Sequence, residues 1–212
     1  MVDSIWPEGN EWQKSAEPQA MLELLQLRGT VSKRKLRLFA AACSRRVWAW
    51  IDPLGRAAVE MAESFADGFA SPEALRAARL ACQGAGGQAA WYAAATNPAI
   101  AARNAARSAQ AGVAKNSLLG SEAAELLAQA RLVRDIFGDP FQPFSFEPSW
   151  LTPAVVELAK TIYDDRDFDR MPKLADALVV AGCDNQEILV HCRTPGPHVR
   201  GCFVVDLILG KE

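Results

Sequence analysis

Apolar residues recur at helical spacing along most of this chain. Between residues 32 and 51 the apolar positions fall three or four residues apart, at Leu36, Phe39, Cys43, Val47 and Trp50. That spacing places them on one face of a helix, so the pattern predicts an amphipathic helix there. The same periodicity predicts further helices over 55–69 and 121–137. No comparable stretch alternates between apolar and polar residues as a half-buried strand would.

Capping residues, prolines and glycines mark where the helices begin and end. Ser71-Pro72-Glu73 combines a capping serine, a first-turn proline and a first-turn acid, which together indicate a helix start. Asn97-Pro98 divides the alanine-rich stretch 88–118 into two helices. These signals and the missing strand patterns predict an all-α fold, with about eight to ten helices in one compact, bundle-like domain.

The predicted domain spans residues 1–212 and has three parts. N-terminal helices occupy 15–83, an alanine-rich middle follows over 84–120, and C-terminal helices occupy 121–212. Alanine favours helix intrinsically, but the middle has few large side chains to anchor it. The final apolar run, 202–209, predicts a buried helix, although its length alone would also suit a strand.

A stretch rich in proline and aromatic residues, 138–151, interrupts the C-terminal helices. Its prolines exclude a helix, and its aromatic rings need to be covered. We therefore expect an extended strap laid across the helices, with a partner-binding surface as the alternative. The aromatic residues in and next to this stretch are Phe137, Phe141, Phe144, Phe146 and Trp150.

Composition and charge narrow the classes of protein. The 212 residues are 50% hydrophobic and carry a net charge of −2, so the overall electrostatics do not favour nucleic acid as a partner. The chain has no run of about 18 uncharged apolar residues, so no membrane span is predicted. Its polar, acidic N-terminus does not resemble a signal peptide. Five cysteines, three of them within apolar helical patterns, predict free thiols and a cytoplasmic location.

A basic helix face is the first candidate binding surface. Lys33, Arg34 and Arg37 lie in or just after the first turn of the 32–51 helix, and no acidic residue occurs between Thr30 and Ile51. The helix dipole disfavours cations in the first turn by about 0.3–1 kcal/mol each, so a negative group is expected nearby. An anionic partner, internal pairing and a simply solvated face all remain open.

Both histidines and two of the cysteines gather in the C-terminal segment 189–212. The residue types suit zinc, and His198 and Cys202 would share a helix face at i, i+4. Against zinc, there is no CxxC pair, and adjacent ligands on a helix point about 100° apart. The alternatives are a cysteine nucleophile with a histidine base and a purely structural cluster. The candidate residues are His191, Cys192, His198 and Cys202.

In the structural interpretation, three cations converge at the start of the last helix. Arg193, His198 and Arg200 flank a rigid Pro-Gly-Pro turn, where the helix dipole disfavours positive charge. A negative counterpart is therefore expected. The acidic run Asp164–Asp169 is the internal candidate, and a bound anion or a partner's carboxylate is the external one. The spacing of this run does not match a calcium-binding loop.

Several blocks of the chain resemble a family of uncharacterised bacterial proteins. Members of that family resemble this chain in a further way, because they have an alanine-rich, variable middle between these blocks. The resemblance covers both ends of the chain. It implies a compact helical protein and carries over no catalytic or cofactor-binding residue. The blocks are Lys35–Ala40 with Cys43, Arg45, Arg46 and Trp48; Arg134–Gly138 with Pro140 and Phe141; Trp150–Thr152; Ala175–Leu178; and His198–Cys202 with Asp206 and Leu207.

For function we expect a non-catalytic helical adaptor that binds another protein or an anionic partner and needs no cofactor. This expectation depends on the absence of a complete catalytic constellation. The alternative is a metal- or thiol-dependent enzyme centred on the C-terminal histidines and cysteines, with zinc as its metal. The residues expected to bind an anion or a partner are Lys33, Arg34, Arg37, Arg193, His198 and Arg200.

Overall fold

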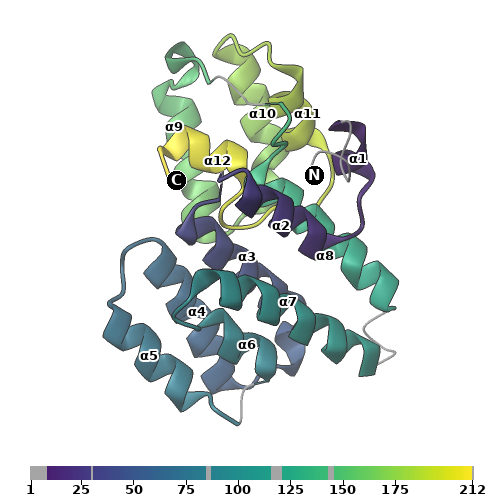
Figure 1. The fold of residues 1–212 in the computed structure, drawn as a ribbon. Helices are drawn as coiled ribbons and strands as arrows, with labels where there is room; N and C mark the ends of the chain where they lie inside the picture. The colour runs from purple at the N-terminus through teal and green to yellow at the C-terminus, as the bar shows by residue number, and fades with distance from the viewer. Residues whose placement is uncertain (1–8, 30, 85–86, 116–120, 143–145, 212) are drawn as a thin grey trace. The chain divides into compact units, whose positions relative to one another are not determined.

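The computed structural model describes residues 9–29, 31–84, 87–115, 121–142 and 146–211 (Figure 1). Within these residues the secondary structure consists of helices, twelve of them α-helices, and contains no strand. The predicted all-α fold is therefore confirmed. One helix beyond the expected ones is α1 (Gly9–Lys14), which forms ahead of the first predicted helix. No helix in the described part of the chain is long and apolar enough to cross a bilayer.

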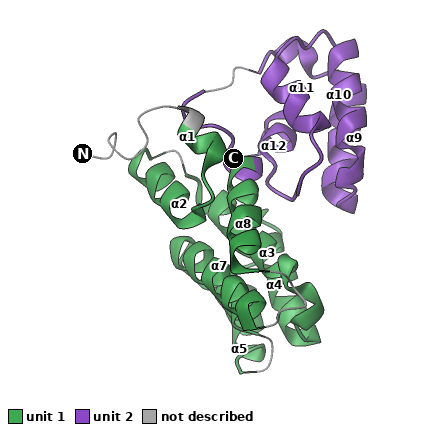
Figure 2. Cartoon of the chain, turned by 90° about the vertical axis from the view of Figure 1, so that its right-hand side faces the viewer, with its two compact units in different colours: residues 1–134 green, residues 135–212 purple. Residues whose placement is uncertain are grey.

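Two compact units make up the chain, unit 1 over residues 1–134 and unit 2 over residues 135–212 (Figure 2). The boundary falls in the last turn of α8 (Glu122–Phe137), so Asp135 is the first residue of unit 2. The sequence-based division placed its boundaries at residues 84 and 120 instead. The expectation of a single domain stays a prediction.

Helix α3 (Lys33–Arg46) is buried along most of its length. Its residues from Leu36 to Ser44 are buried one after another, so neighbouring helices cover several of its faces. It packs against α4 (Pro53–Ala66), α6 (Gln88–Ala93) and α7 (Pro98–Lys115) (Figure 1). The other helices of unit 1 are α1, α2 (Pro18–Leu27), α5 (Pro72–Ala81) and the larger part of α8.

The alanine-rich middle supplies a packing surface for α3. α7 packs against α3 and α6, and the alanines on its inner face are fully buried. Small side chains let helix axes approach closely, because the interaxial distance is set by the residues at the contact. The buried residues of α7 are Ala101, Ala102, Ala105, Ala106, Ala109 and Val113.

The predicted helix starts are capped as their sequences indicate. The Oγ atom of Ser32 accepts the Lys35 N–H at 3.0 Å, and that of Ser71 accepts the Ala74 N–H at 3.1 Å. Each bond satisfies one of the first-turn N–H groups that have no partner inside the helix. Capping therefore fixes where α3 and α5 begin.

Unit 2 packs four further helices around one apolar core: α9 (Pro153–Asp165), α10 (Met171–Val180), α11 (Gln186–Arg193) and α12 (Phe203–Leu209). α10 packs against α9 and α11, and α12 packs against α9. Most residues of α12 are buried. The predicted buried helix over 202–209 is therefore confirmed, and the strand alternative is wrong.

The proline- and aromatic-rich strap, residues 138–151, forms no α-helix among its described residues. It ends in a short 3₁₀ turn over Pro148–Trp150. Trp150 is buried in the core of unit 2, and Phe146 packs edge-on against it with ring centroids 5.3 Å apart. These two rings contribute to the core, as expected of a strap. Phe144 lies outside the described residues.

Candidate metal centre

Three neighbouring segments of unit 2 bring together a small cluster of side chains that could bind a metal ion. Asp135 comes from the last turn of α8, His191 from α11, and His198 and Cys202 from the non-helical segment 194–202 and its junction with α12. Gly201 has φ +94°, a conformation that favours glycine. The resulting turn lets the Cys202 N–H donate to the Val199 carbonyl at 2.9 Å.

The polar atoms of these four residues converge on one point. Asp135 Oδ1 lies 2.7 Å from His198 Nδ1 and 3.2 Å from His191 Nε2. The same His191 nitrogen lies 3.3 Å from Cys202 Sγ. One ligand atom from each of the four residues lies within 4.8 Å of the others, and both Asp135 and Cys202 are buried. The cluster is therefore a candidate metal centre.

The carboxylate and one histidine stabilise each other's charged forms. Burial alone would raise the pKa of Asp135, but hydrogen bonds and positive charge from His191 and His198 outweigh it and lower that pKa. Burial alone would lower the pKa of His198, but the hydrogen bond and charge of Asp135 raise it. In the absence of a metal ion, Asp135 thus favours the protonated form of His198, and the two histidines favour the ionised form of Asp135.

In the absence of a metal ion, the protonated thiol is the favoured form of Cys202. Burial is the main reason that its pKa is raised, and the charges of Asp135 and Cys192 act in the same direction. The backbone N–H groups of Val205 and Val204 lie near the sulfur and oppose the shift. A bound metal ion would reverse this balance, because a coordinating thiol is deprotonated.

Groups around the cluster orient its members. The second carboxylate oxygen of Asp135, Oδ2, accepts the Val199 N–H at 3.0 Å. His198 Nε2 lies 3.3 Å from the Thr194 carbonyl oxygen, so the ring can donate there and leave Nδ1 facing the cluster. The His191 ring packs against Phe203, with ring centroids 4.5 Å apart. Outer hydrogen bonds of this kind set the tautomer and ring orientation of metal-binding histidines.

Cys192 does not belong to the cluster, although the sequence suggested it. It follows His191 on α11, and adjacent residues of a helix point about 100° apart. Its side chain lies in the core of unit 2, where burial raises its pKa to about 12. Of the sequence-based set of His191, Cys192, His198 and Cys202, the structure brings three members together with Asp135, and Cys192 lies outside this group.

Asp135 is the member that sequence reasoning missed. It belongs to the α8 helix, far from the two histidines in sequence. One local signal was available in the sequence, because Asp135 falls on the same helix face as the apolar residues Leu132 and Ile136. The structure shows that all three side chains are buried. A carboxylate near a helix C-terminus is also disfavoured by the helix dipole. Both features indicate that a cationic partner lies nearby.

The three C-terminal cations do not share the acidic run Asp164–Asp169 as their counterpart. His198 pairs with Asp135, and Arg193 pairs with Asp176 at 3.1 Å on the exposed surface. Arg200 donates to the backbone carbonyls of Tyr163 and Asp164, both at 3.3 Å. The internal candidate was therefore wrong for His198. His198 also precedes α12 instead of lying on its face with Cys202, because α12 begins only at Phe203.

Most of the basic residues of α3 bind carbonyl or carboxylate groups of unit 1. Arg37 is 3% exposed and donates to the carbonyls of Ala93, Ala95 and Thr96 at 3.2, 2.7 and 3.0 Å. Its burial lowers its pKa to about 10. Arg34 pairs with Asp67 at 3.0 Å, and Lys33 is exposed. An internal partner thus explains Arg34 and Arg37, while an anion- or partner-binding role for this face stays a prediction.

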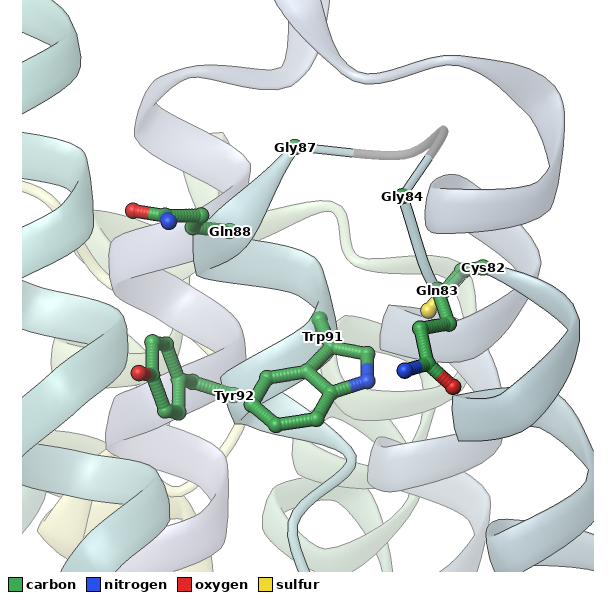
Figure 3. A pocket seen from close by; sticks show the side chains of 7 residues that line it. All are labelled: Cys82, Gln83, Gly84, Gly87, Gln88, Trp91 and Tyr92. Carbon is green, nitrogen blue, oxygen red and sulfur yellow. The ribbon is translucent and has the colours of Figure 1, made fainter.

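A surface hollow of about 340 Å³ lies beside α6 in unit 1 (Figure 3). Trp91 and Tyr92 form part of its wall, with ring centroids 4.9 Å apart, and the Arg79 guanidinium stacks 3.9 Å from the Trp91 centroid. Its other side chains include Gln83 and the thiol of Cys82, whose pKa is raised mainly by burial. Among the described residues that line this hollow, none is a carboxylate or a histidine.

Comparisons with known proteins found no relative of this chain. No protein-family model matches the chain, and neither a curated protein nor a solved structure matches it.

Proposed function

We propose that unit 2 binds a divalent transition metal ion, zinc, through Asp135, His191, His198 and Cys202. The observation that carries this proposal is the environment of His191 Nε2. This nitrogen lies 3.2 Å from Asp135 Oδ1 and 3.3 Å from Cys202 Sγ. One imidazole nitrogen carries either a single proton or a single lone pair, so it cannot bond well to both partners. Donor atoms that converge in this way are typical of a metal site.

The chemistry of the four donors suits zinc. Histidine nitrogen, thiolate sulfur and carboxylate oxygen are its usual protein ligands, at about 2.0–2.3 Å. In a tetrahedral shell such bonds place neighbouring donors about 3.3–3.6 Å apart. The two distances from His191 Nε2, 3.2 Å to Asp135 Oδ1 and 3.3 Å to Cys202 Sγ, are close to this range. A soft thiolate and two imidazoles also favour zinc over magnesium or calcium, which prefer oxygen ligands.

The charge of the ligand set supports the same assignment. A carboxylate and a thiolate carry two negative charges, and two neutral imidazoles add none. A divalent cation therefore leaves the buried site electrically neutral. This neutrality matters because an uncompensated charge among buried groups is costly.

A cysteine nucleophile is less well supported by this geometry. Nucleophilic catalysis requires a histidine that faces the thiol through one nitrogen and is oriented through the other. Here Asp135 and Cys202 both face the same nitrogen of His191. Cys202 is also 0% exposed, so a substrate has no direct access to the sulfur. The adaptor function stays a prediction.

We also propose a reducing, cytoplasmic location for the protein. The five free cysteines support this proposal.

Metal analysis of the full chain, purified without a histidine tag, tests the proposal. We expect one equivalent of zinc per chain, removal by a chelator, and recovery of one binding site in calorimetric titration. Cys202→Ala should abolish this site. Cys183→Ala is the matched control, because Cys183 is another buried thiol of unit 2 outside the cluster. Equal zinc binding by both variants, or no binding by the native chain, would refute the proposal.

A further inference from the structure

We infer that the metal acts as a structural clamp with a closed shell of four protein ligands, and that its loading controls whether the 194–202 segment is held in place. This inference rests on the proposed zinc site and adds its role and regulatory consequence. Catalytic zinc sites typically use three protein ligands and keep one position for water, whereas structural sites are closed by four. The cluster supplies four protein donors.

Burial around the cluster supports a closed shell. The side chains of Asp135 and His198 are 4% and 9% exposed, and Cys202 is 0% exposed. His191 is the most open member at 19%, and the buried ring of Phe203 packs against it. Little surface therefore remains through which a substrate would reach a metal ion bound by these groups.

The ligands join parts of unit 2 that are distant in the sequence. Asp135 and His198 are 63 residues apart, and a cross-link that closes a long loop removes more entropy from the unfolded chain than one that closes a short loop. Two of the ligands, His198 and Cys202, lie within the 194–202 segment, which contains no helix. A metal bound there would tie this segment to the end of α8 and to α11.

Apart from the proposed metal, hydrogen bonds help to hold the 194–202 segment in place. Within it, the His198 N–H donates to the Gly196 carbonyl at 3.0 Å, and the Cys202 N–H donates to Val199. Its longer-range polar contacts include Val199 to Asp135 and Arg200 to the end of α9, the latter at 3.3 Å. The contacts through Asp135 depend on the same carboxylate that would bind the metal. Zinc removal should therefore loosen this segment more than the helices around it.

Amide hydrogen exchange of the full chain, zinc-loaded and chelator-treated, tests the clamp. With free zinc at about 100 times its dissociation constant, linkage predicts about a hundredfold slower exchange through opening of the metal-bound segment. We expect this protection in peptides covering 194–203 and none in peptides covering α4, which belongs to unit 1. Unchanged exchange at 194–203, in a chain that binds one zinc ion, would overturn the clamp but leave the proposed zinc site standing.

Cobalt substitution tests whether the shell is closed. The visible spectrum of the Co²⁺-loaded chain should show tetrahedral coordination with a thiolate ligand, and added azide should leave it unchanged. A spectral change with azide would reveal an open coordination position and overturn the closed shell. Failure of both Zn²⁺ and Co²⁺ to bind would instead refute the proposed function itself, so the two failures are distinguishable.

Discussion

His198 Nδ1 lies 2.7 Å from Asp135 Oδ1, while Oδ2 of the same carboxylate accepts the N–H of Val199 at 3.0 Å. Two consecutive residues of the 194–202 segment are thus bound to one side chain at the end of α8. The bonds to this carboxylate fix its orientation and leave Oδ1 facing His191 as well. Asp135 is therefore the residue on which the geometry of the cluster depends most.

Replacing Asp135 should destabilise the chain even when no metal is bound. In the presence of a chelator, we expect Asp135→Asn to lower the free energy of unfolding by about 3 kcal/mol, because it breaks a buried, hydrogen-bonded ion pair. Chemical denaturation followed by circular dichroism measures the change. Asp176→Asn is the control, since Asp176 pairs with Arg193 on the exposed surface and should cost less than about 1 kcal/mol. Equal effects of the two variants would contradict this prediction.

Gly201 should be required for metal binding as well as for stability. Its φ of +94° makes alanine costly, by about 1–2 kcal/mol, and relaxation of the turn would displace the adjacent Cys202. We expect Gly201→Ala to weaken zinc binding measurably in calorimetric titration. Gly182→Ala is the matched control: Gly182 has φ +88° but lies at the turn after α10. It should show a similar loss of stability with unchanged zinc affinity, and weakened affinity in both variants would contradict the prediction.

Cys192 should be unreactive in the folded chain. Burial is the largest cause that raises its pKa, to about 12, so at pH 8 only about one molecule in ten thousand carries the reactive thiolate. We expect no alkylation of Cys192 by iodoacetamide at pH 8, measured by peptide mass spectrometry. The same residue should react readily in urea, which serves as the control. Fast labelling of Cys192 in the native chain would contradict its buried position and revive the thiol-enzyme alternative.

Arg37 should matter for stability through its backbone contacts. Arg37→Ala removes a buried guanidinium that donates to three carbonyls at and just after the C-terminal end of α6. Two of these acceptors, the carbonyls of Ala93 and Ala95, are buried, and each buried acceptor left without a donor costs about 1–3 kcal/mol. We expect a loss of at least about 3 kcal/mol in chemical denaturation. Lys33→Ala, at an exposed position on the same helix, should change stability by less than about 0.5 kcal/mol. A negligible effect of Arg37→Ala would refute the structural role.

Several helices were predictable because the residues that specify them lie close together in the sequence. The apolar spacing from Leu36 to Trp50 predicts a helix whose core matches α3, and Ser71-Pro72-Glu73 predicts the start of α5. Helix periodicity and capping depend on residues within a few positions of one another. The sequence by itself therefore determined an all-helical protein and the places where many of its helices begin.

Which residues make up the candidate metal centre was decided only by the tertiary structure. The sequence singled out His191, His198 and Cys202 as rare, clustered side chains, but it also included Cys192 and omitted Asp135. Cys192 is not part of the cluster because successive residues of a helix point in different directions. Its side chain lies in the core of unit 2, while that of His191 faces the cluster. Asp135 joins because folding of unit 2 brings the end of α8 beside a segment 63 residues later. Contacts at that separation depend on how whole helices pack, and local sequence patterns carry no information about such packing.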